Sequence, residues 1–498
     1  MIDKKTPATP ETRNALYENM GKTIEIFSPN LKKHIILKEL LDKNILNDES
    51  IIFDSFLSLS IYAQYTSIEL ASVFRACFRA NLPAEKRYNI KWINCVILEA
   101  YKHLYGYGGK RKKSLWALHI KSALQLVNDS KFIQDCSDLE NHLIKFGTDE
   151  ITNVEQRNLS FHYDPEPVSV YEMLMGLNEE EEAQRLNRFM KLLEKITLFT
   201  SKYIGKYKAT INEEPKLISR YEFTLFELDI FQNKKDILFS ESGNAIKSHS
   251  ERLDTFILHQ NIPTKINQHF ENLDEESVAP IHRLLEIEKI AIQLTFLYID
   301  LASALRAFIS SEYVLEKQLS LKQVIIIVYE GFNKLYGIDD NSQNSFWKKY
   351  VCPVISQTTE NTTLCEFNSM DKELQELKLN IKSFSNQRQL SVHLDKGLIE
   401  VYSMLHNMNP FKELQKALLL LNFLPKFLNF LNKCLYIVEL NSQSIHEKRM
   451  APTYEKIDNV MNMLEKAPDN QQKEDLIEML RKVKSGDFFD EIMKRKRK

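Results

Sequence analysis

Apolar residues along this chain recur at helical spacing, three to five positions apart. Phe56, Leu59, Tyr62 and Tyr65 follow one another in this way. The pattern predicts helices over 51–79, 89–105, 114–128, 136–163 and 180–207. With only 12 Gly and 14 Pro in 498 residues, turn material is scarce, which argues against a β-sandwich or barrel. The expected fold class is therefore all-α.

An internal duplication organises the chain. The stretch 156–164, Gln-Arg-Asn-Leu-Ser-Phe-His-Tyr-Asp, returns as Gln-Arg-Gln-Leu-Ser-Val-His-Leu-Asp at 387–395, a separation of 231 residues (388 − 157). The same separation relates matched residues over a long span without a gap. Examples are Arg75 and Arg306, Glu85 and Glu316, Lys91 and Lys322, Leu104-Tyr105-Gly106 and Leu335-Tyr336-Gly337, and Trp116 and Trp347. Two copies of about 160 residues each favour a two-domain pseudo-dimer over a solenoid, whose units are shorter.

The predicted architecture is two duplicated up-and-down helical bundles that form an intramolecular pseudo-dimer, followed by a helical C-terminal extension. Residues 1–50 are predicted to be a tail and a helix, 51–212 the first repeat and 213–280 a helical linker. The second repeat is placed at 281–447, and 448–498 is a polar extension with a basic tail. The motif is expected at the end of the helix 136–163, where Pro165 blocks continuation.

Composition and charge narrow the class of protein. Hydrophobic content of 43% and charged content of 27% are typical of a soluble globular protein. The net charge of −2 gives no global signature of nucleic-acid binding, so such binding would come from local patches. The six cysteines have no CxxC spacing and indicate buried thiols in a reducing compartment. Because 1–14 lacks an apolar core and 417–440 contains polar residues and Pro425, we expect a cytoplasmic protein with no membrane partner.

The repeated Arg-x4-His motif is the strongest chemical signal. Arg157-Asn158-Leu159-Ser160-Phe161-His162 resembles the motif of the HEPN superfamily, whose members are small helical bundles and in many cases ribonucleases. Arg388-Gln389-Leu390-Ser391-Val392-His393 is similar, with Gln where the family usually has Asn. The resemblance covers about six residues in each copy. It implies metal-independent RNA cleavage with no cofactor, by two motifs that face each other across a shared cleft.

The chemistry of these side chains fits that implication. Asn158 and His162 are four residues apart, as are Gln389 and His393, so on a helix each amide could fix the tautomer of its imidazole. Each His is the candidate acid–base group for a ribose 2′-OH or the leaving 5′-oxygen. Arg157 and Arg388 are the candidates that hold the scissile phosphate. The resemblance implies products with a 2′,3′-cyclic phosphate, and the alternative is a salt-bridged helix cap involving Asp164 or Asp395.

Other residues matched between the copies have two interpretations each. Arg75, Glu99, Arg306 and Glu330 either surround the motif or form interhelical salt bridges, and the second is favoured. Tyr171 and Tyr402 either hydrogen-bond the phosphate or a base, or pack in the core. Trp116 and Trp347 are expected core anchors. The basic loop Lys110-Arg111-Lys112-Lys113 could grip an RNA backbone, but the second copy has Asp-Asp-Asn at 339–341, and a solvated loop is preferred.

Two functions remain open. The first is a HEPN-like endoribonuclease of toxin or antiviral-defence type, with RNA such as tRNA, an antitoxin or regulatory protein, and a second copy of the chain as partners. The second is a catalytically inactive HEPN-like module that binds a partner protein or a nucleotide. No HExxH, GxSxG, GxGxxG or paired Cys/His set is present, which disfavours metal hydrolase, serine hydrolase and dinucleotide enzyme.

Overall fold

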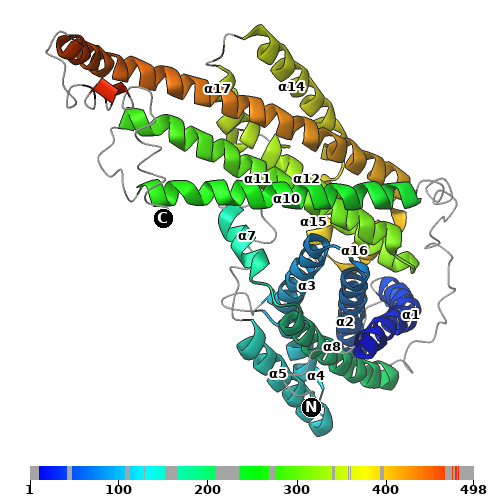
Figure 1. The fold of residues 1–498 in the computed structure, drawn as a ribbon. Helices are drawn as coiled ribbons and strands as arrows, with labels where there is room; N and C mark the ends of the chain where they lie inside the picture. Colours follow the sequence, from blue (N-terminus) through cyan, green and yellow to red (C-terminus); the bar gives the residue numbers. More distant parts are fainter. Residues whose placement is uncertain are drawn as a thin grey trace.

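The protein is helical throughout the part that the computed structural model describes. The described residues are 10–41, 48–106, 113–127, 129–151, 167–207, 235–267, 275–338, 343–356, 358, 360–392, 397–465, 474, 477–478 and 480–481. No strand occurs within these ranges, so the all-α expectation is confirmed for them. The N-terminal helices, blue to teal, lie towards one end of the molecule, and the C-terminal helices, green to orange, towards the other (Figure 1).

The helices fall into two series of similar order. The first series is α1 Pro10–Leu41, α2 Asp48–Arg79, α3 Pro83–Leu104, the π-helix η2 Trp116–Ile120, α4 Lys121–Leu126, α5 Ser130–Glu150, α7 Pro167–Met175 and α8 Glu179–Tyr207. The second series is α10 Lys235–Asn267, α11 Glu275–Ser310, α12 Val314–Leu335, the π-helix η6 Trp347–Val351, α13 Cys352–Ile355, α14 Asn361–Lys382, α15 Ser385–Val392, α16 Leu398–Asn407 and α17 Pro410–Glu465.

Several helix bounds recur at the separation of 231 residues found in the sequence. Both ends of α3 and α12 are related in this way (314 − 83 and 335 − 104), as are both ends of η2 and η6. After α3 and α12 the chain turns at Gly106, with φ 79°, and at Gly337, with φ 87°. Only glycine adopts this left-handed conformation without cost, which explains why both helices end at a glycine.

The first helix of each series also has a counterpart, at a different separation. Gly21 of α1 and Gly243 of α10 are 222 residues apart (243 − 21), and Ile24, Leu31 and Ile35 match Ile246, Leu253 and Ile257 at the same separation. These six apolar side chains are all buried. The Ser28 and Ser250 hydroxyls donate to the carbonyls of Ile24 and Ile246, at 2.6 and 2.7 Å. α1 therefore packs along α2 as α10 packs along α11.

The match between α1 and α10 was not part of the domain boundaries predicted from the sequence. A tail and a helix were predicted within residues 1–50, and α1 already begins at Pro10. The predicted boundaries placed α10 in a linker, whereas α10 is a core-packed helix with Ile246 fully buried. The reason is that the separation changes from 231 to 222 before α2 and α11, so a search at one fixed separation misses the match. Residues 448–465, predicted to begin the polar extension, are the end of α17.

The helix predicted at 136–163 begins earlier than expected, and residues 152–163 of the prediction lie outside the described part of the chain. α5 begins at Ser130, with Asp129 capping its first turn through the backbone N–H groups of Lys131 and Phe132, and ends at Glu150. In the second series α14 ends at Lys382, and α15 follows after a turn at Ser383 and Phe384. The Phe384 side chain is fully buried at this turn. The second motif therefore begins on a short helix of its own and not on the end of a long one.

The buried apolar side chains of both series form one continuous core. α2 and α11 lie at its centre and are buried on almost all sides, as their nearly continuous apolar sequences require. Trp116 and Trp347 are buried as expected, and Trp347 stacks on Phe367 with ring centroids 4.7 Å apart. Within the described part of the chain, Arg283–Ser310 is long and apolar enough to cross a membrane, but its most apolar window is entirely buried in the protein.

Candidate functional site

The structure describes one part of the repeated motif. Arg157, Asn158 and His162 lie outside the described residues, as do His393 and the basic residues Lys110, Arg111 and Lys112. Lys113 is described and exposed. The geometry of the candidate site is therefore given by α15, which carries Arg388 and Gln389, and by the helices around it.

Arg388 is tied to α12 by Glu330. Its Nε donates to Glu330 Oε1 at 2.6 Å, and its Nη2 forms an ion pair with the same oxygen. The guanidinium carbon also lies 5.8 Å from the centre of the Tyr329 ring. The Arg388 side chain keeps 25% of its surface exposed, against 12% for Glu330. The guanidinium is thus fixed in orientation and remains reachable from solvent.

α15 and the turn before it are hydrogen-bonded to α17. Gln387 Nε2 donates to Glu413 Oε1 of α17 at 3.1 Å, and Lys416 donates to the other Glu413 oxygen at 3.0 Å. Lys416 also donates to Ser383 Oγ, at 2.8 Å. Gln389 is exposed, whereas Leu390 packs against the core. The amphipathic placement leaves the Gln389 amide on the solvent side of the helix.

Arg75 is buried between α1 and α12. It is 1% exposed, and its Nη1 and Nη2 donate to the Tyr17 carbonyl at 3.2 Å and the Tyr17 hydroxyl at 3.0 Å. It forms ion pairs with Glu312 and, at 3.6 Å from its Nε, with Glu316. Gly21 leaves the space for it, since a Cβ there would lie 2.7 Å from Arg75 Nη1.

Arg306 has a similar setting between α10 and α3. Its Nε donates to Glu85 Oε1 at 2.9 Å, its Nη2 donates to Asn81 Oδ1 at 3.0 Å, and its Nη1 donates to the Phe239 carbonyl. A Cβ at Gly243 would lie 2.7 Å from Nη1. Arg75 and Arg306 thus form salt bridges between the two series of helices. Glu99 and Glu330 take no part in these salt bridges and pair with Lys102 and Arg388.

A second pair of buried ion pairs joins the same helices. Lys322 donates to Glu69 at 2.6 Å and to the Tyr65 hydroxyl at 2.9 Å. Burial opposes the charge of Lys322, but Glu69 and Tyr65 outweigh burial and hold the pKa of Lys322 above its usual value. Lys91 forms an ion pair with Asp300, and both side chains are 7% exposed. The sequence match of Lys91 with Lys322 marked both cations, but not their partners.

The remaining candidates are placed as follows. Glu99 forms an ion pair with Lys102 at 3.0 Å. The Tyr171 hydroxyl of α7 donates to Asp254 of α10 at 2.8 Å, and burial together with this hydrogen bond raises the pKa of Tyr171 to about 12. Tyr402 of α16 is 3% exposed, and its ring centroid is 4.1 Å from that of His406.

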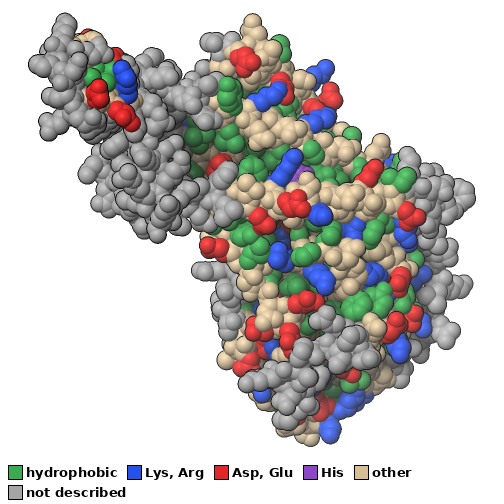
Figure 2. Space-filling view, in the orientation of Figure 1, with side chains coloured by type: hydrophobic (Ala, Val, Ile, Leu, Met, Phe, Trp, Pro, Cys, Tyr) green, Lys and Arg blue, Asp and Glu red, His purple; other side chains and the backbone are tan. Residues whose placement is uncertain are grey.

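Metal-ligating groups do not gather anywhere in the described ranges, where no set of three or more His, Cys, Asp or Glu side chains could hold an ion. Acidic and basic side chains alternate on the face drawn in Figure 2, with no large area of one sign among the coloured residues. No protein-family model, curated protein or solved structure matches the chain. Inference about function therefore depends on the residues themselves.

Proposed function

We propose that this chain is an intramolecular pseudo-dimer of two HEPN-like helical bundles that cleaves RNA without a metal ion. Reciprocal contacts support the pseudo-dimer. Arg75 pairs with Glu316 and Arg306 with Glu85, while Lys322 pairs with Glu69 and Lys91 with Asp300. Each pair becomes the other when 231 is added to one residue and subtracted from its partner. Such exchange of partners is the mark of a two-fold interface.

The observation that carries the nuclease proposal is the setting of Arg388. One Glu330 oxygen accepts from two nitrogens of the guanidinium, which has five N–H donors, and a quarter of the side chain is exposed. The donors that have no partner among the described residues suit a phosphate, because a fixed guanidinium binds a phosphate through two hydrogen bonds and stabilises charge that develops on it. The first copy has Glu99 and Arg157 at the matching positions.

The proposed reaction is an intramolecular transesterification, in which the phosphorus of the RNA backbone passes from the 5′-oxygen to the adjacent 2′-oxygen. An imidazole, His162 or His393, removes the proton from the ribose 2′-OH, and the 2′-oxygen forms a bond to the adjacent phosphorus. The bond from phosphorus to the 5′-oxygen breaks, and that oxygen receives a proton from an imidazolium. Arg157 or Arg388 neutralises the negative charge of the phosphorane. The products carry a 2′,3′-cyclic phosphate and a 5′-hydroxyl.

The test is cleavage of total RNA and of a purified tRNA by the full chain in the presence of EDTA. We expect cleavage with 2′,3′-cyclic phosphate ends, and a loss of at least about 100-fold in rate for the His162→Ala/His393→Ala double variant. The matched control is His142→Ala, which removes an exposed histidine of α5. Equal RNA decay by the double variant and the wild type would remove the nuclease assignment.

One observation favours a second, non-catalytic function. Glu330 neutralises Arg388, and Gln387 and Glu413 pin α15 to α17, so this region could simply hold helices together for a protein partner. Arg388→Ala separates the two functions. A catalytic Arg388 predicts lost cleavage with little change in stability, and a structural one predicts lost stability in a protein without cleavage. The toxin or defence role, an antitoxin or second copy as partner, and a cytoplasmic location are proposals that depend on the nuclease.

A further inference from the structure

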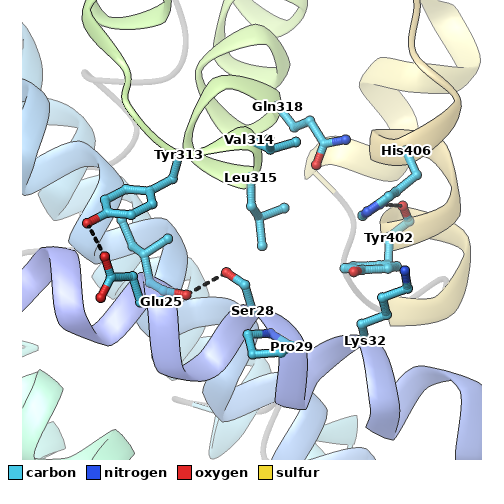
Figure 3. Close-up of a pocket in the computed structure, with 11 residues that line it drawn as sticks. Glu25, Ser28, Pro29, Lys32, Tyr313, Val314, Leu315, Gln318, Tyr402 and His406 are labelled. Atoms are coloured by element: carbon cyan, nitrogen blue, oxygen red, sulfur yellow. Dashed lines mark hydrogen bonds between the residues drawn. The ribbon is translucent and has the colours of Figure 1, made fainter. Parts of the chain in front are cut away.

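A pocket lies where α1, α12 and α16 meet. Its volume is about 260 Å³, and Figure 3 shows the side chains that line it. Ile24, Val314 and Leu315 provide apolar wall, while Lys32, Gln318 and His406 bring polar groups. The volume is just below the roughly 300–1,000 Å³ typical of sites for drug-sized ligands, so the pocket suits a ligand of one ring.

Gln318 brings an unpartnered amide to this pocket. The residue is 1% exposed, and neither its nitrogen nor its oxygen has a hydrogen-bond partner among the described residues. In Figure 3 the amide extends towards His406 and the space at the centre of the pocket. A buried amide without partners is costly to the fold, and a ligand with an adjacent donor and acceptor would satisfy both of its ends.

A cation and a flat aromatic surface lie across from Gln318. Lys32 is half-buried, reaches towards Tyr402 in Figure 3, and has no ion pair within the described chain. The acid that also lines the pocket, Glu25, accepts a hydrogen bond from the Tyr313 hydroxyl at 2.9 Å. Burial lowers the pKa of His406, which favours the neutral ring. That ring lies against the Tyr402 ring, with centroids 4.1 Å apart.

The matching place in the N-terminal half has different residues. By the separations of 222 and 231, Asp254 takes the place of Lys32, Arg87 that of Gln318, and Tyr171 that of Tyr402. There the tyrosine hydroxyl donates to the aspartate, at 2.8 Å. A lysine beside an unpartnered amide and a histidine is therefore found on the α1–α12–α16 side only, since Met175 takes the place of His406.

We propose that this pocket binds a small planar organic anion, a single-ring heterocyclic carboxylate with neighbouring N–H and C=O groups. The ring packs on Tyr402 and His406, the N–H and C=O pair with the Gln318 amide, and the carboxylate accepts from the Lys32 ammonium. We choose a carboxylate as the anionic group because it is small. It leaves room for a ring in this volume. The assignment is independent of RNA cleavage, since it uses none of the motif residues.

Calorimetric titration of the full chain with orotate tests the proposal, because orotate has a ring, a carboxylate and adjacent N–H and C=O groups. We expect one saturable site per chain. Lys32→Met and Gln318→Leu should each weaken binding at least about tenfold, and Gln318→Leu should also raise the melting temperature by removing the unpartnered amide. Uracil, without a carboxylate, and benzoate, without the N–H and C=O edge, should bind at least about tenfold more weakly than orotate.

The matched control is Tyr171→Phe on the opposite side, which should leave orotate affinity unchanged. The proposal is overturned if orotate shows no saturable binding up to about 10 mM, or if its affinity is the same in Lys32→Met and Gln318→Leu as in the wild type. Equal binding of uracil and orotate would also overturn it, since it would remove the role of Lys32. Both variants are expected to fold, because Lys32 has no ion pair with a described residue to lose and Leu fits an apolar wall.

Discussion

Arg75 and Arg306 occupy matching positions, but the carboxylates that they contact differ in how many other groups hold them. Glu316 pairs with Arg75 and Arg79, and it accepts hydrogen bonds from the backbone N–H groups of Glu312 at 2.9 Å and Tyr313 at 3.3 Å. Glu85 pairs with Arg306 alone among the described residues, and its second oxygen has no partner. Glu85 lacks a second arginine because Ser310 stands in the second half where the first half has Arg79.

The two halves share the buried ion pairs but differ in the residues around them. The buried cations and their acids are kept as types in both halves, because each acid serves the opposite half and cannot change without leaving a charge unpaired. The surroundings have diverged, as with Arg79 and Ser310, or the lysine and aspartate at positions 32 and 254. Substitutions at matched positions can therefore measure the divergence directly.

The largest effect is expected from Arg306→Met. It leaves Glu85 as a buried carboxylate without a cation, so the free energy of unfolding should fall by about 3–5 kcal/mol in urea at pH 7. Arg75→Met should cost less, about 1–3 kcal/mol, because Arg79 and two backbone N–H groups still hold Glu316. Lys426→Met, which breaks an exposed pair with Glu373, should cost at most about 1 kcal/mol.

Restoring neutrality gives the control for that series. Arg306→Met/Glu85→Leu replaces the ion pair by apolar side chains, and it should recover most of the stability lost in Arg306→Met. Equal losses for Arg75→Met and Arg306→Met would contradict the idea that Arg79 makes one side redundant.

The second prediction uses His249, whose counterpart in α1 is Phe27 (249 − 222). Burial lowers the pKa of His249 from 6.5 to about 4, with Arg252 adding to the shift, and the ring is 4.1 Å from the Tyr298 ring. Between pH 6.5 and about pH 4, the unfolded chain therefore binds a proton at His249 and the folded chain does not. This contribution to stability is present above pH 6.5 and is lost as the pH falls towards 4, by about 2–3 kcal/mol.

His249→Phe should remove that loss, so the variant should gain stability relative to the wild type as the pH is lowered from 6.5 to 4. Urea unfolding at several pH values measures the difference. Parallel curves for the two proteins over this range would show that His249 does not titrate as a buried group.

The sequence predicted which residues of the two halves correspond, but it did not predict which residues of one half contact the other half. The fixed separation paired Trp116 with Trp347 and the glycines that end α3 and α12, because these residues stay in one uninterrupted register. It matched Arg75 with Arg306 and Glu85 with Glu316, but a match between copies does not say that the arginine of one half meets the glutamate of the other. That information lies in the docking of α3 against α11, and of α12 against α2, which periodicity does not encode.

The sequence predicted the Arg-x4-His motif of the candidate site, but not the residues that surround the motif. The break between α14 and α15 has no proline or glycine in Ser383-Phe384-Ser385, so helical periodicity runs through it and predicts a longer helix. The pairing of Glu330 with Arg388 follows from that break, because α15 then packs on α12. The pocket beside Gln318 left no sequence signal, since a buried amide without partners is visible only once its neighbours are placed.

A third, smaller effect is expected at Gly331, whose counterpart is Ala100 (331 − 231). A Cβ at Gly331 would lie 2.2 Å from Leu297 Cδ1, whereas Thr66 takes the place of Leu297 in the first half. Gly331→Ala should lower the free energy of unfolding by about 1–2 kcal/mol, as overpacking outweighs the better helix propensity of Ala. Gly331→Ala/Leu297→Val should recover part of this, and a stabilised Gly331→Ala would mean that Leu297 moves freely.

The smallest effect is expected from Tyr171→Phe, on the side where the tyrosine is hydrogen-bonded to Asp254. Loss of this partly exposed hydrogen bond should cost about 0.5–1 kcal/mol at pH 7. Burial and Asp254 raise the pKa of Tyr171 from 10.0 to about 12, so the folded chain keeps the hydroxyl proton more tightly than the unfolded chain. This contribution is complete below pH 10 and is lost as the pH rises towards 12. The wild type and Tyr171→Phe should therefore converge in stability across that range, and a constant difference would place the stabilising effect of Tyr171 in its packing and not in its hydroxyl.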